Sequence, residues 1–214
     1  GCYCLTEPNA GSDAAALQTR AVKDGEDWVI SGTKIWVTNG GLASLAIVYA
    51  RTDVDAPKAK GISAFLVPLD AEGVSRGAPE KKTGIRASST VGIQFDGVRV
   101  SADSLVGEEN RGFQVAMDTL DGGRIGIASQ AVGIGRACLE ASVKYASERE
   151  QFDKPIGRFQ AIQWKIADMA TRIDAARLLT WRAAQLREPV ERLERGVHRR
   201  EENLPVARRG PHHW

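Results

Sequence analysis

A turn-rich loop near the start of the chain has residue types that can hold a phosphate or the edge of a heterocyclic ring. Residues 4–13 (CLTEPNAGSD) begin as an apolar strand and break into Pro8, Asn9, Gly11, Ser12 and Asp13, which all favour turns. Such loops expose backbone N–H groups and small hydroxyls, which can hydrogen-bond an anion or a ring. A surface turn without a ligand is the simpler interpretation of this segment taken alone.

The segment Trp36-Val37-Thr38-Asn39 could line a flat aromatic ligand. Trp36 and Thr38 are two positions apart, and side chains at that spacing point to the same face of a strand. A planar ring and a hydroxyl on one face suit a heteroaromatic ring system. The alternative is that Trp36 packs in the core while Thr38 caps a turn.

Arg124 lies on an apolar helical pattern, three residues before Ile127. A charge on a buried helix face is costly unless it is paired or binds an anion. Asp121, one turn earlier, can supply an ion pair within the helix. Gly122 and Gly123 weaken the helix and could let a ligand approach the backbone. Ligand contact and structural pairing are both open interpretations of this site.

Neither the charge nor the composition favours a nucleic-acid-binding or membrane-inserted protein. The 214 residues carry a formal net charge of +2, which gives little attraction for polyanions. No run approaches the roughly 18 apolar residues of a transmembrane helix. The three cysteines do not form a disulfide framework, and no metal site is expected. His212 and His213 fit a flexible tail better than a metal site.

The first hundred residues have the pattern of a β domain. Short apolar runs at 45–50 and 62–67 have the length of buried strands. Ser31-Gly32-Thr33 predicts a turn between strands at 28–30 and 35–38. Asp96-Gly97 predicts a hairpin between strands at 91–95 and 98–100. We therefore expect an antiparallel β-sandwich or barrel.

Two long helices are expected to follow the β domain. Apolar residues recur in steps of three and four from 113 to 145 and again from 159 to 176, with a loop at 149–157. Each helix would leave an apolar face uncovered, so the pair is an incomplete bundle whose partner helices come from elsewhere. The expected class is α+β, with a β domain at 1–108 and two bundle helices at 109–187. The tail at 188–214 does not continue the helical pattern and is expected to be disordered.

Taken together, these motifs resemble the acyl-CoA dehydrogenase family. Residues 4–13 resemble its first signature, Trp36-Val37-Thr38 its flavin-contacting segment and residues 120–125 (LDGGRI) its substrate segment. Residues 147–160 are similar to the family's Arg-x-x-Phe loop. The likeness runs in register over about residues 2–187 and is closest to the short-chain, butyryl-CoA-type branch.

The resemblance implies roles for individual residues. FAD would contact the first loop, the Trp-Val-Thr segment and, across a subunit interface, the Arg-x-x-Phe loop. The CoA moiety would contact Ser12 and the substrate segment. The implied cofactor-binding residues are Tyr3, Cys4, Leu5, Thr6, Ser12, Trp36, Val37, Thr38, Arg149 and Gln160; the implied substrate-binding residues are Ser12, Asp121, Gly122, Gly123 and Arg124.

The activity that the resemblance implies is FAD-dependent dehydrogenation of short-chain acyl-CoA thioesters to 2-enoyl-CoA. In this family a glutamate removes the α proton while the β hydrogen leaves as a hydride. The family also implies a place in fatty-acid β-oxidation, electron-transferring flavoprotein as electron acceptor and a homotetramer. Bacterial cytoplasm or the mitochondrial matrix is the implied location.

The resemblance also predicts a fragment that lacks the family's N-terminal helical domain and the end of its C-terminal four-helix bundle, so that the two helices form an incomplete four-helix bundle. No catalytic base is assigned, because the family places its glutamate beyond the matched region or, in some branches, at the position of Gly123. Two further functions stay open. One is an acyl-CoA oxidase of the same fold, and the other is a catalytically inactive chain that binds flavin or CoA or serves assembly.

Overall fold

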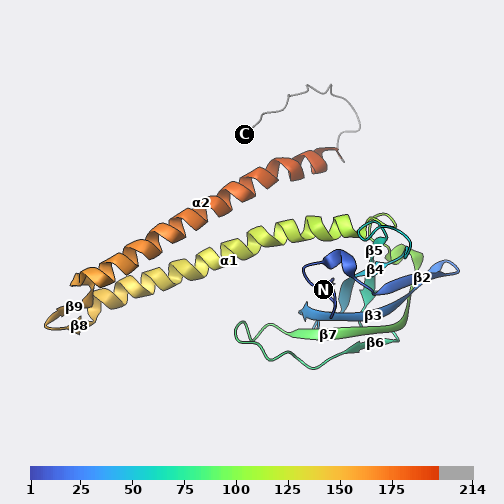
Figure 1. The fold of residues 1–214 in the computed structure, drawn as a ribbon, viewed down its shortest axis with the longest axis horizontal. Helices are drawn as coiled ribbons and strands as arrows, with labels where there is room; N and C mark the ends of the chain where they lie inside the picture. Colours follow the sequence, from blue (N-terminus) through green and yellow to red (C-terminus); the bar gives the residue numbers. More distant parts are fainter. Residues whose placement is uncertain (198–214) are drawn as a thin grey trace, which may run out of the picture. The chain divides into compact units, whose positions relative to one another are not determined.

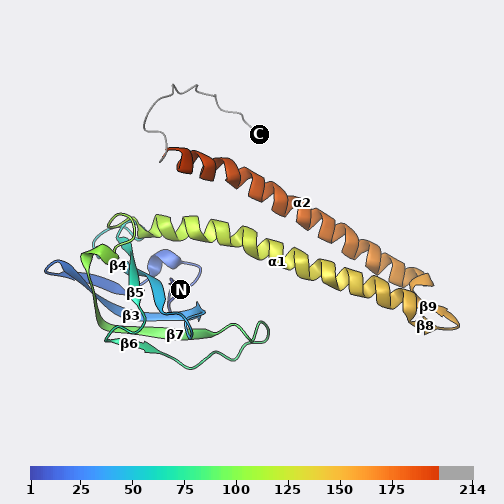
Figure 2. The same ribbon diagram turned by 180° about the vertical axis from the view of Figure 1, so that it is seen from behind.

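The computed structural model describes residues 1–197, and Figures 1 and 2 show the chain from opposite sides. The chain divides into two compact units between Leu120 and Asp121. The first unit contains a β-sheet and the first turns of a long helix. The second unit contains the remainder of that helix and a second long helix.

The first unit is built on one seven-stranded sheet, with hydrogen-bonded order β1-β4-β2-β3-β7-β6 and with β5 paired to β4. The strands are β1 Cys2–Cys4, β2 Arg20–Asp24, β3 Asp27–Thr38, β4 Leu45–Arg51, β5 Ile62–Pro68, β6 Val74–Arg76 and β7 Thr90–Val100; the short helices are η1 Ala14–Ala16 and η2 Ala102–Ser104.

The sheet confirms the expected α+β class but is mixed rather than wholly antiparallel. β4 pairs in parallel with β1 and with the start of β2, while the other strand pairs are antiparallel. The reason is the long connection from β1 to β4, which includes β2 and β3. A connection of that length lets two strands meet in the same direction, whereas a short hairpin cannot.

Both predicted turns lie inside continuous strands, at one β-bulge where Ser31 of β3 opposes Asp96 and Gly97 of β7, so the two hairpin predictions are wrong. Ser31 lies within β3 and Asp96-Gly97 within β7, and the register of this strand pair shifts between Ile30 and Gly32. Residues that favour turns also accommodate the extra residue of a bulge, and Gly97 adopts a φ of 62° there. A tight hairpin instead joins β2 to β3 through Gly25.

Two apolar clusters form the core of this unit. One includes Trp28, Ile30 and Phe65, and the other packs Leu17, Tyr49 and Ile62 against the first turns of α1 (Gly112–Glu148). Glycine is required at position 112, because a Cβ there would lie 2.4 Å from the backbone carbonyl carbon of Ser63. The start of α1 is therefore held tightly against β5.

The second unit is an antiparallel helical hairpin, which Figures 1 and 2 both show. Residues 121–148 of α1 lead through β8 (Glu150–Gln151), β9 (Lys154–Pro155) and η3 (Ile156–Arg158) to α2 (Gln160–Val197). A Cβ at Gly122 would lie 2.3 Å from the Arg187 side chain, and one at Gly135 would lie 3.4 Å from Ile173. These approaches fix the antiparallel pairing and confirm the two predicted helices.

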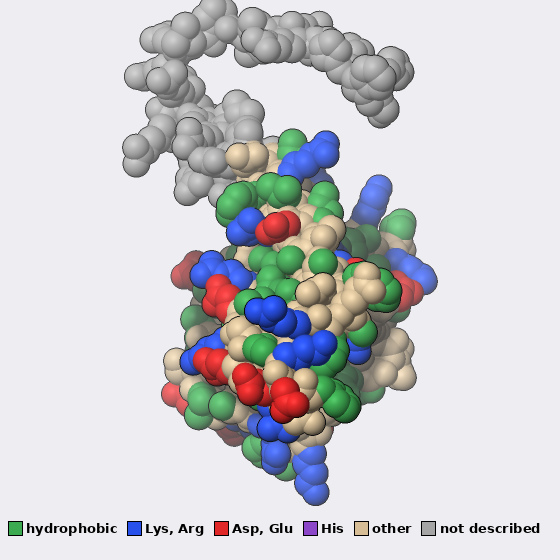
Figure 3. Space-filling model, turned by 90° about the vertical axis from the view of Figure 1, so that its left-hand side faces the viewer, with side chains coloured by type: hydrophobic (Ala, Val, Ile, Leu, Met, Phe, Trp, Pro, Cys, Tyr) green, Lys and Arg blue, Asp and Glu red, His purple; other side chains and the backbone are tan. Residues whose placement is uncertain are grey.

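The helices leave many apolar side chains uncovered, as predicted. Ile127 and Ile134 of α1 and Leu178 and Trp181 of α2 are each more than half exposed. Figure 3 shows hydrophobic side chains, in green, interspersed with charged ones on the surface that it presents. The apolar faces of this unit therefore remain available to further protein.

The backbone of α2 continues through residues 188–197, which the sequence assigned to a non-matching tail. Glu, Arg and Leu are good helix formers, so the charged composition of this stretch does not end the helix. The rest of the predicted tail, with His212 and His213, lies outside the described residues.

Within residues 1–197, no helix is both long and apolar enough to cross a bilayer. The same residues contain no group of three or more His, Cys, Asp or Glu side chains that could hold a metal ion. Cys2, Cys4 and Cys138 are free thiols, in agreement with the predicted lack of a disulfide framework.

Candidate functional site

A β-bulge near the end of β3 brings the two strongest motifs together. Between Lys34 and Val37, β3 has one residue more than β7. Ile35 therefore leaves the ladder, and its N–H donates to the carbonyl oxygen of Thr6 at 2.9 Å. The first loop is thus hydrogen-bonded to the strand that carries Trp36.

Trp36 is presented to solvent by an uncommon backbone conformation. Its φ is 56°, in the left-handed region that bulky side chains rarely adopt, and its side chain is 58% exposed. Val37 is buried and Thr38 is exposed, so Trp36 and Thr38 both avoid the core that Val37 joins. The alternative of a core Trp36 is therefore excluded. A strained, exposed aromatic residue is a candidate for ligand contact.

An apolar hollow of about 500 Å³ lies at one end of this segment. The hydroxyl-bearing residues Tyr3 and Thr38 and the amide of Asn39 line it together with apolar side chains that include Leu45 and Ile47. A mostly apolar wall with a few polar groups is typical of a site for a heteroaromatic ligand. The structure thus brings Tyr3 and Thr38, both assigned to the flavin by resemblance, to one hollow.

Three other predicted cofactor residues point their side chains into the core. Cys4, Leu5 and Val37 are 0%, 7% and 1% exposed, so their side chains are not available to a ligand. Tyr3 is half-buried, and its hydroxyl donates to the carbonyl oxygen of Ala116 at 3.2 Å. Burial raises the pKa of Tyr3, so this hydroxyl stays protonated at neutral pH.

The two remaining loop hydroxyls are accessible. Thr6 is half-buried, and Ser12 is exposed, two residues before η1 begins at Ala14. Next to Ser12, Asp13 pairs with Lys58 at 3.3 Å on the surface. Thr6 and Ser12 are therefore both free to approach a bound molecule.

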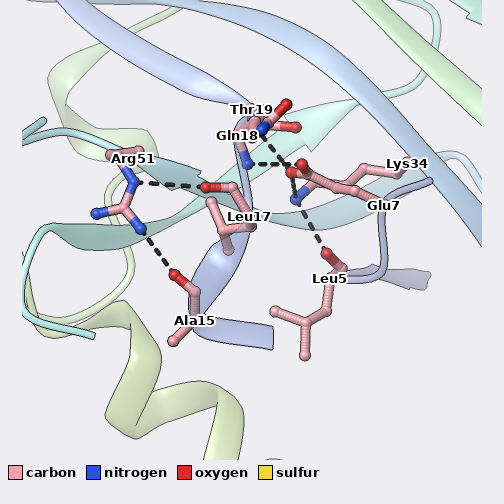
Figure 4. A network of polar contacts seen from close by, with 8 residues as sticks. All are labelled: Leu5, Glu7, Ala15, Leu17, Gln18, Thr19, Lys34 and Arg51. Carbon is pink, nitrogen blue, oxygen red and sulfur yellow. Dashed lines mark hydrogen bonds and ion pairs between the residues drawn. The ribbon is translucent and has the colours of Figure 1, made fainter. Parts of the chain in front are cut away.

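Behind the first loop lies a buried ion pair that the sequence did not predict (Figure 4). Lys34 Nζ is 2.8 Å from Glu7 Oε1, and the two side chains are 0% and 5% exposed. Lys34 also donates to the carbonyl oxygen of Leu5 at 3.1 Å. The Glu7 carboxylate accepts from the backbone N–H groups of Gln18 at 2.6 Å and Thr19 at 3.0 Å.

The electrostatics of this pair explain why Glu7 is not a suitable proton acceptor. Burial acts to raise the pKa of Glu7, but the charge and hydrogen bond of Lys34 oppose it, and the pKa lies below its ordinary value. Burial lowers the pKa of Lys34, and the Glu7 charge opposes that shift. Glu7 is thus an ionised carboxylate held by three donors, consistent with leaving it unassigned as a base.

A sequence signal for this pair existed. Lys34 lies on the same inward-facing side of β3 as Trp28 and Ile30, and a lysine at a buried position needs a partner for its charge. The partner could not be identified from sequence, because Glu7 lies in a different segment, 27 residues away.

In the second unit, Asp121 and Arg124 form an ion pair, and their side chains are 62% and 68% exposed. The expectation that Arg124 lies on a buried face is wrong for the described residues. The reason is that α2 covers the face of α1 that carries Gly122, next to Arg187, and leaves Arg124 outside. The intrahelical pairing is therefore observed, and ligand contact by Arg124 stays a prediction.

Arg149 and Gln160 flank the β8–β9 hairpin, and both are exposed. The backbone carbonyl of Arg149 accepts from the N–H of Ile156 at 2.8 Å, which closes the hairpin. Their side chains are accessible, as the predicted contact with a cofactor requires.

Two family models match the chain in succession. Residues 2–98 match the model described as acyl-CoA dehydrogenase, middle domain, and residues 110–198 match the model described as acyl-CoA dehydrogenase, C-terminal domain. The first range covers the sheet and the second covers the helical hairpin.

Individual relatives agree with these matches. The mitochondrial short-chain specific acyl-CoA dehydrogenase of Bos taurus is 54% identical over 188 residues, which are 88% of this chain and 45% of that protein. Butyryl-CoA dehydrogenase from Megasphaera elsdenii has a TM-score of 0.85 at 45% identity, over 88% of this chain and 50% of its own. Glutaryl-CoA dehydrogenase from Mycobacterium smegmatis, solved in complex with FADH2, has a TM-score of 0.78 at 40% identity, over 84% and 45%. The chain spans about half the length of the relatives that it matches.

Proposed function

Because the chain belongs to the acyl-CoA dehydrogenase family, we propose that it binds FAD and acyl-CoA for the α,β-dehydrogenation of short-chain acyl-CoA thioesters to 2-enoyl-CoA. The observation that carries the proposal is the bulge of β3, which exposes Trp36 two residues before Thr38, and Thr38 lines an apolar hollow. The names of similar proteins specify short-chain acyl-CoA and butyryl-CoA, and they support the proposal that the acyl group of the substrate is short.

Two residues that line the hollow, Tyr3 and Thr38, and two residues of the adjoining segments, Thr6 and Trp36, fit the ring system of FAD. The indole of Trp36 supplies a flat apolar surface, while the hydroxyls of Thr6 and Thr38 can hydrogen-bond the polar edge of the ring. Tyr3 adds an aromatic wall to the hollow. When bound, FAD supplies the hydride acceptor that no side chain can provide. The protein's contribution is to orient the ring and exclude water from it.

The CoA moiety is assigned to Ser12 and to residues 121–124. Arg124 is exposed, so its guanidinium can exchange the Asp121 carboxylate for an anionic or polar group of CoA. Gly123 has open space where a Cβ would lie, which allows close approach of a ligand, whereas the Arg187 side chain lies against Gly122. Arg149 and Gln160 are assigned to the adenylate half of FAD bound by a neighbouring subunit.

The same proposal includes partners and a location. Electron-transferring flavoprotein is the proposed electron acceptor, and a homotetramer is the proposed assembly. The uncovered apolar side chains of α1 and α2 support self-association. Bacterial cytoplasm or the mitochondrial matrix is the proposed compartment, in line with the bacterial and mitochondrial relatives.

The proposal is tested by reconstituting the 214-residue chain with FAD and then adding butyryl-CoA without oxygen. We expect a perturbed flavin spectrum on binding and a further shift on addition of the CoA ester. Because no residue is assigned as the catalytic base, we expect the flavin absorbance to persist.

Thr38→Val is the informative variant, and Thr33→Val is its control. Both threonines are exposed on β3, but only Thr38 lines the apolar hollow. Loss of one hydrogen bond should weaken FAD binding by about tenfold in Thr38→Val and leave Thr33→Val unchanged. Failure of the unaltered chain to bind FAD would contradict the proposal. Bleaching by butyryl-CoA would instead show that a base is present among these residues.

A further inference from the structure

We propose that the buried Lys34–Glu7 ion pair is a positioning device that holds residues 5–7 in the conformation needed to contact the flavin. This inference rests on the proposed function, because it assumes that a flavin ring lies against Thr6 and Trp36. It assigns neither residue to the chemistry itself, since both side chains are enclosed in protein.

Three consecutive residues of the first loop are hydrogen-bonded to two adjacent residues of β3, Lys34 and Ile35. Leu5 accepts from Lys34 Nζ through its carbonyl, Thr6 accepts from the N–H of Ile35 at 2.9 Å, and the Glu7 carboxylate accepts from Lys34 Nζ at 2.8 Å. The peptide planes on both sides of Thr6 are therefore fixed. The direction of the Thr6 hydroxyl depends on these planes.

The other side of the Glu7 carboxylate fixes where the loop returns to the sheet. It accepts from the consecutive N–H groups of Gln18 and Thr19, immediately before β2 begins at Arg20. Figure 4 shows these donors and Lys34 converging on one carboxylate. The ion pair thus links the beginning and the end of the loop that contains Ser12 to the strand that carries Trp36.

Stability alone does not account for an ion pair at this place. Moving two charges out of water is costly, and a hydrophobic pair of similar volume is often as stable or more stable. A hydrophobic pair could not donate to the Leu5 carbonyl or accept from two backbone N–H groups. What the charged pair adds is a defined loop geometry, next to the residues that line the hollow.

The bulge extends this control to Trp36. Lys34 is the last residue of β3 in register with β7 before the bulge, and Trp36 adopts its left-handed φ only two residues later. A side chain at position 34 that is anchored at both Leu5 and Glu7 limits how far β3 can relax. Release of Lys34 should therefore let the exposed indole lose its orientation.

The test replaces the pair by apolar residues of similar size, Glu7→Leu with Lys34→Met, in the full chain. This double variant should fold, because it leaves no unpaired buried charge. The matched control is Lys23→Met with Glu109→Leu, which removes an exposed lysine–glutamate pair of 2.9 Å from the same unit.

Two measurements decide the inference. In the absence of flavin, amide hydrogen exchange at Gln18 and Thr19 should accelerate in the Glu7→Leu/Lys34→Met variant but not in the control. With FAD, its dissociation constant should rise at least about tenfold, and the bound-flavin spectrum should lose resolution, while circular dichroism stays unchanged. The control should retain the unaltered affinity and spectrum.

An unchanged FAD affinity and spectrum in the folded double variant would overturn the inference, and so would unchanged exchange at Gln18 and Thr19. Failure of the proposed function has a different signature. It would show in the unaltered chain as a lack of FAD binding, whereas failure of the positioning role shows only when the double variant is compared with the unaltered chain.

Discussion

At the scale of single residues, burial and partners decide roles that residue type leaves open. Glu7 belongs to the strongest motif of the chain, and its carboxylate could be taken for a catalytic group. In the structure that carboxylate forms an ion pair with Lys34 and accepts hydrogen bonds from two backbone N–H groups. Conversely, Trp36 has a side chain typical of cores, and the bulge exposes it.

Glu7→Gln should destabilise the sheet most strongly at neutral pH. Removing one partner of a buried ion pair costs about 3–5 kcal/mol, because the Lys34 charge is left unpaired. The pKa of Glu7 is lowered by folding, so its stabilising effect is present above its ordinary value of 4.5 and is lost as the pH falls through the folded-state pKa. The free energies of unfolding of the two proteins should therefore converge below pH 4.5.

Urea unfolding at several pH values, followed by tryptophan fluorescence, measures this convergence. Glu109→Gln, which removes the acidic partner of an exposed pair, serves as the control and should change stability by less than about 1 kcal/mol at every pH. A constant difference between the unaltered chain and Glu7→Gln from pH 7 to pH 3 would contradict the prediction.

Trp36→Gly should preserve stability while it weakens FAD binding. Glycine adopts a positive φ without strain, so the change removes about 1–2 kcal/mol of backbone cost and compensates for the lost indole contacts. The flavin, in contrast, loses an aromatic surface. Thermal unfolding and FAD titration separate these effects.

Ile85→Gly is a matched control for Trp36→Gly. Ile85 is another exposed apolar residue of the first unit with a positive φ, 49°, and it belongs to neither of the segments 4–13 and 36–39 that are assigned to the flavin. The FAD affinity of the Ile85→Gly variant should equal that of the unaltered chain. Equal affinities for all three proteins would indicate that Trp36 does not contact the ring.

At the scale of elements, the sequence predicts periodicity better than connectivity. The helical steps of three and four predict both long helices, whereas the assignment of the first loop and of the Trp-Val-Thr segment to the flavin stays a prediction. Asp96-Gly97 predicts a hairpin because glycine permits a positive φ, but a bulge needs the same conformation. The Lys34–Glu7 pair joins segments 27 residues apart, a contact that local pattern does not encode.

Gly123 offers a test of whether a ligand approaches α1. A Cβ at Gly123 meets nothing within 4 Å, so Gly123→Ala should stabilise the helix by about 1 kcal/mol. If CoA lies against this backbone, the added methyl group should also weaken binding of a CoA ester. Gly133 of the same helix is equally unobstructed, and Gly133→Ala should stabilise without affecting the ligand.

Calorimetry of butyryl-CoA binding and thermal unfolding measure the two effects of the glycine substitutions. If the affinity for the CoA ester falls in Gly123→Ala but not in Gly133→Ala, the result supports close approach of the ligand to Gly123. Stabilisation of both variants with equal affinity for the ester would mean that Gly123 has no role in binding.

At the scale of the whole molecule, the two units differ in how completely they bury their own apolar side chains. The first unit encloses Trp28, Tyr49, Phe65 and Phe95 at 4% exposure or less. The second has no comparable core among its described residues, since Ala146 is its only buried hydrophobic residue there. Sequence periodicity predicted this imbalance, because two helices cannot cover each other on all apolar sides.

The exposed helix faces should therefore drive self-association of the chain. Ile134 of α1 and Leu179 of α2 are 58% and 65% exposed, so Glu at both positions removes no internal contact of consequence and should leave the helical content unchanged. Two charges in a buried interface are costly, so Ile134→Glu/Leu179→Glu should shift an oligomer to monomer in light scattering. Gln130→Glu adds a charge at an exposed polar position of α1 and should leave the oligomer intact. A monomeric unaltered chain throughout the micromolar range would contradict the proposed homo-oligomer, and an oligomeric double variant would place the interface elsewhere.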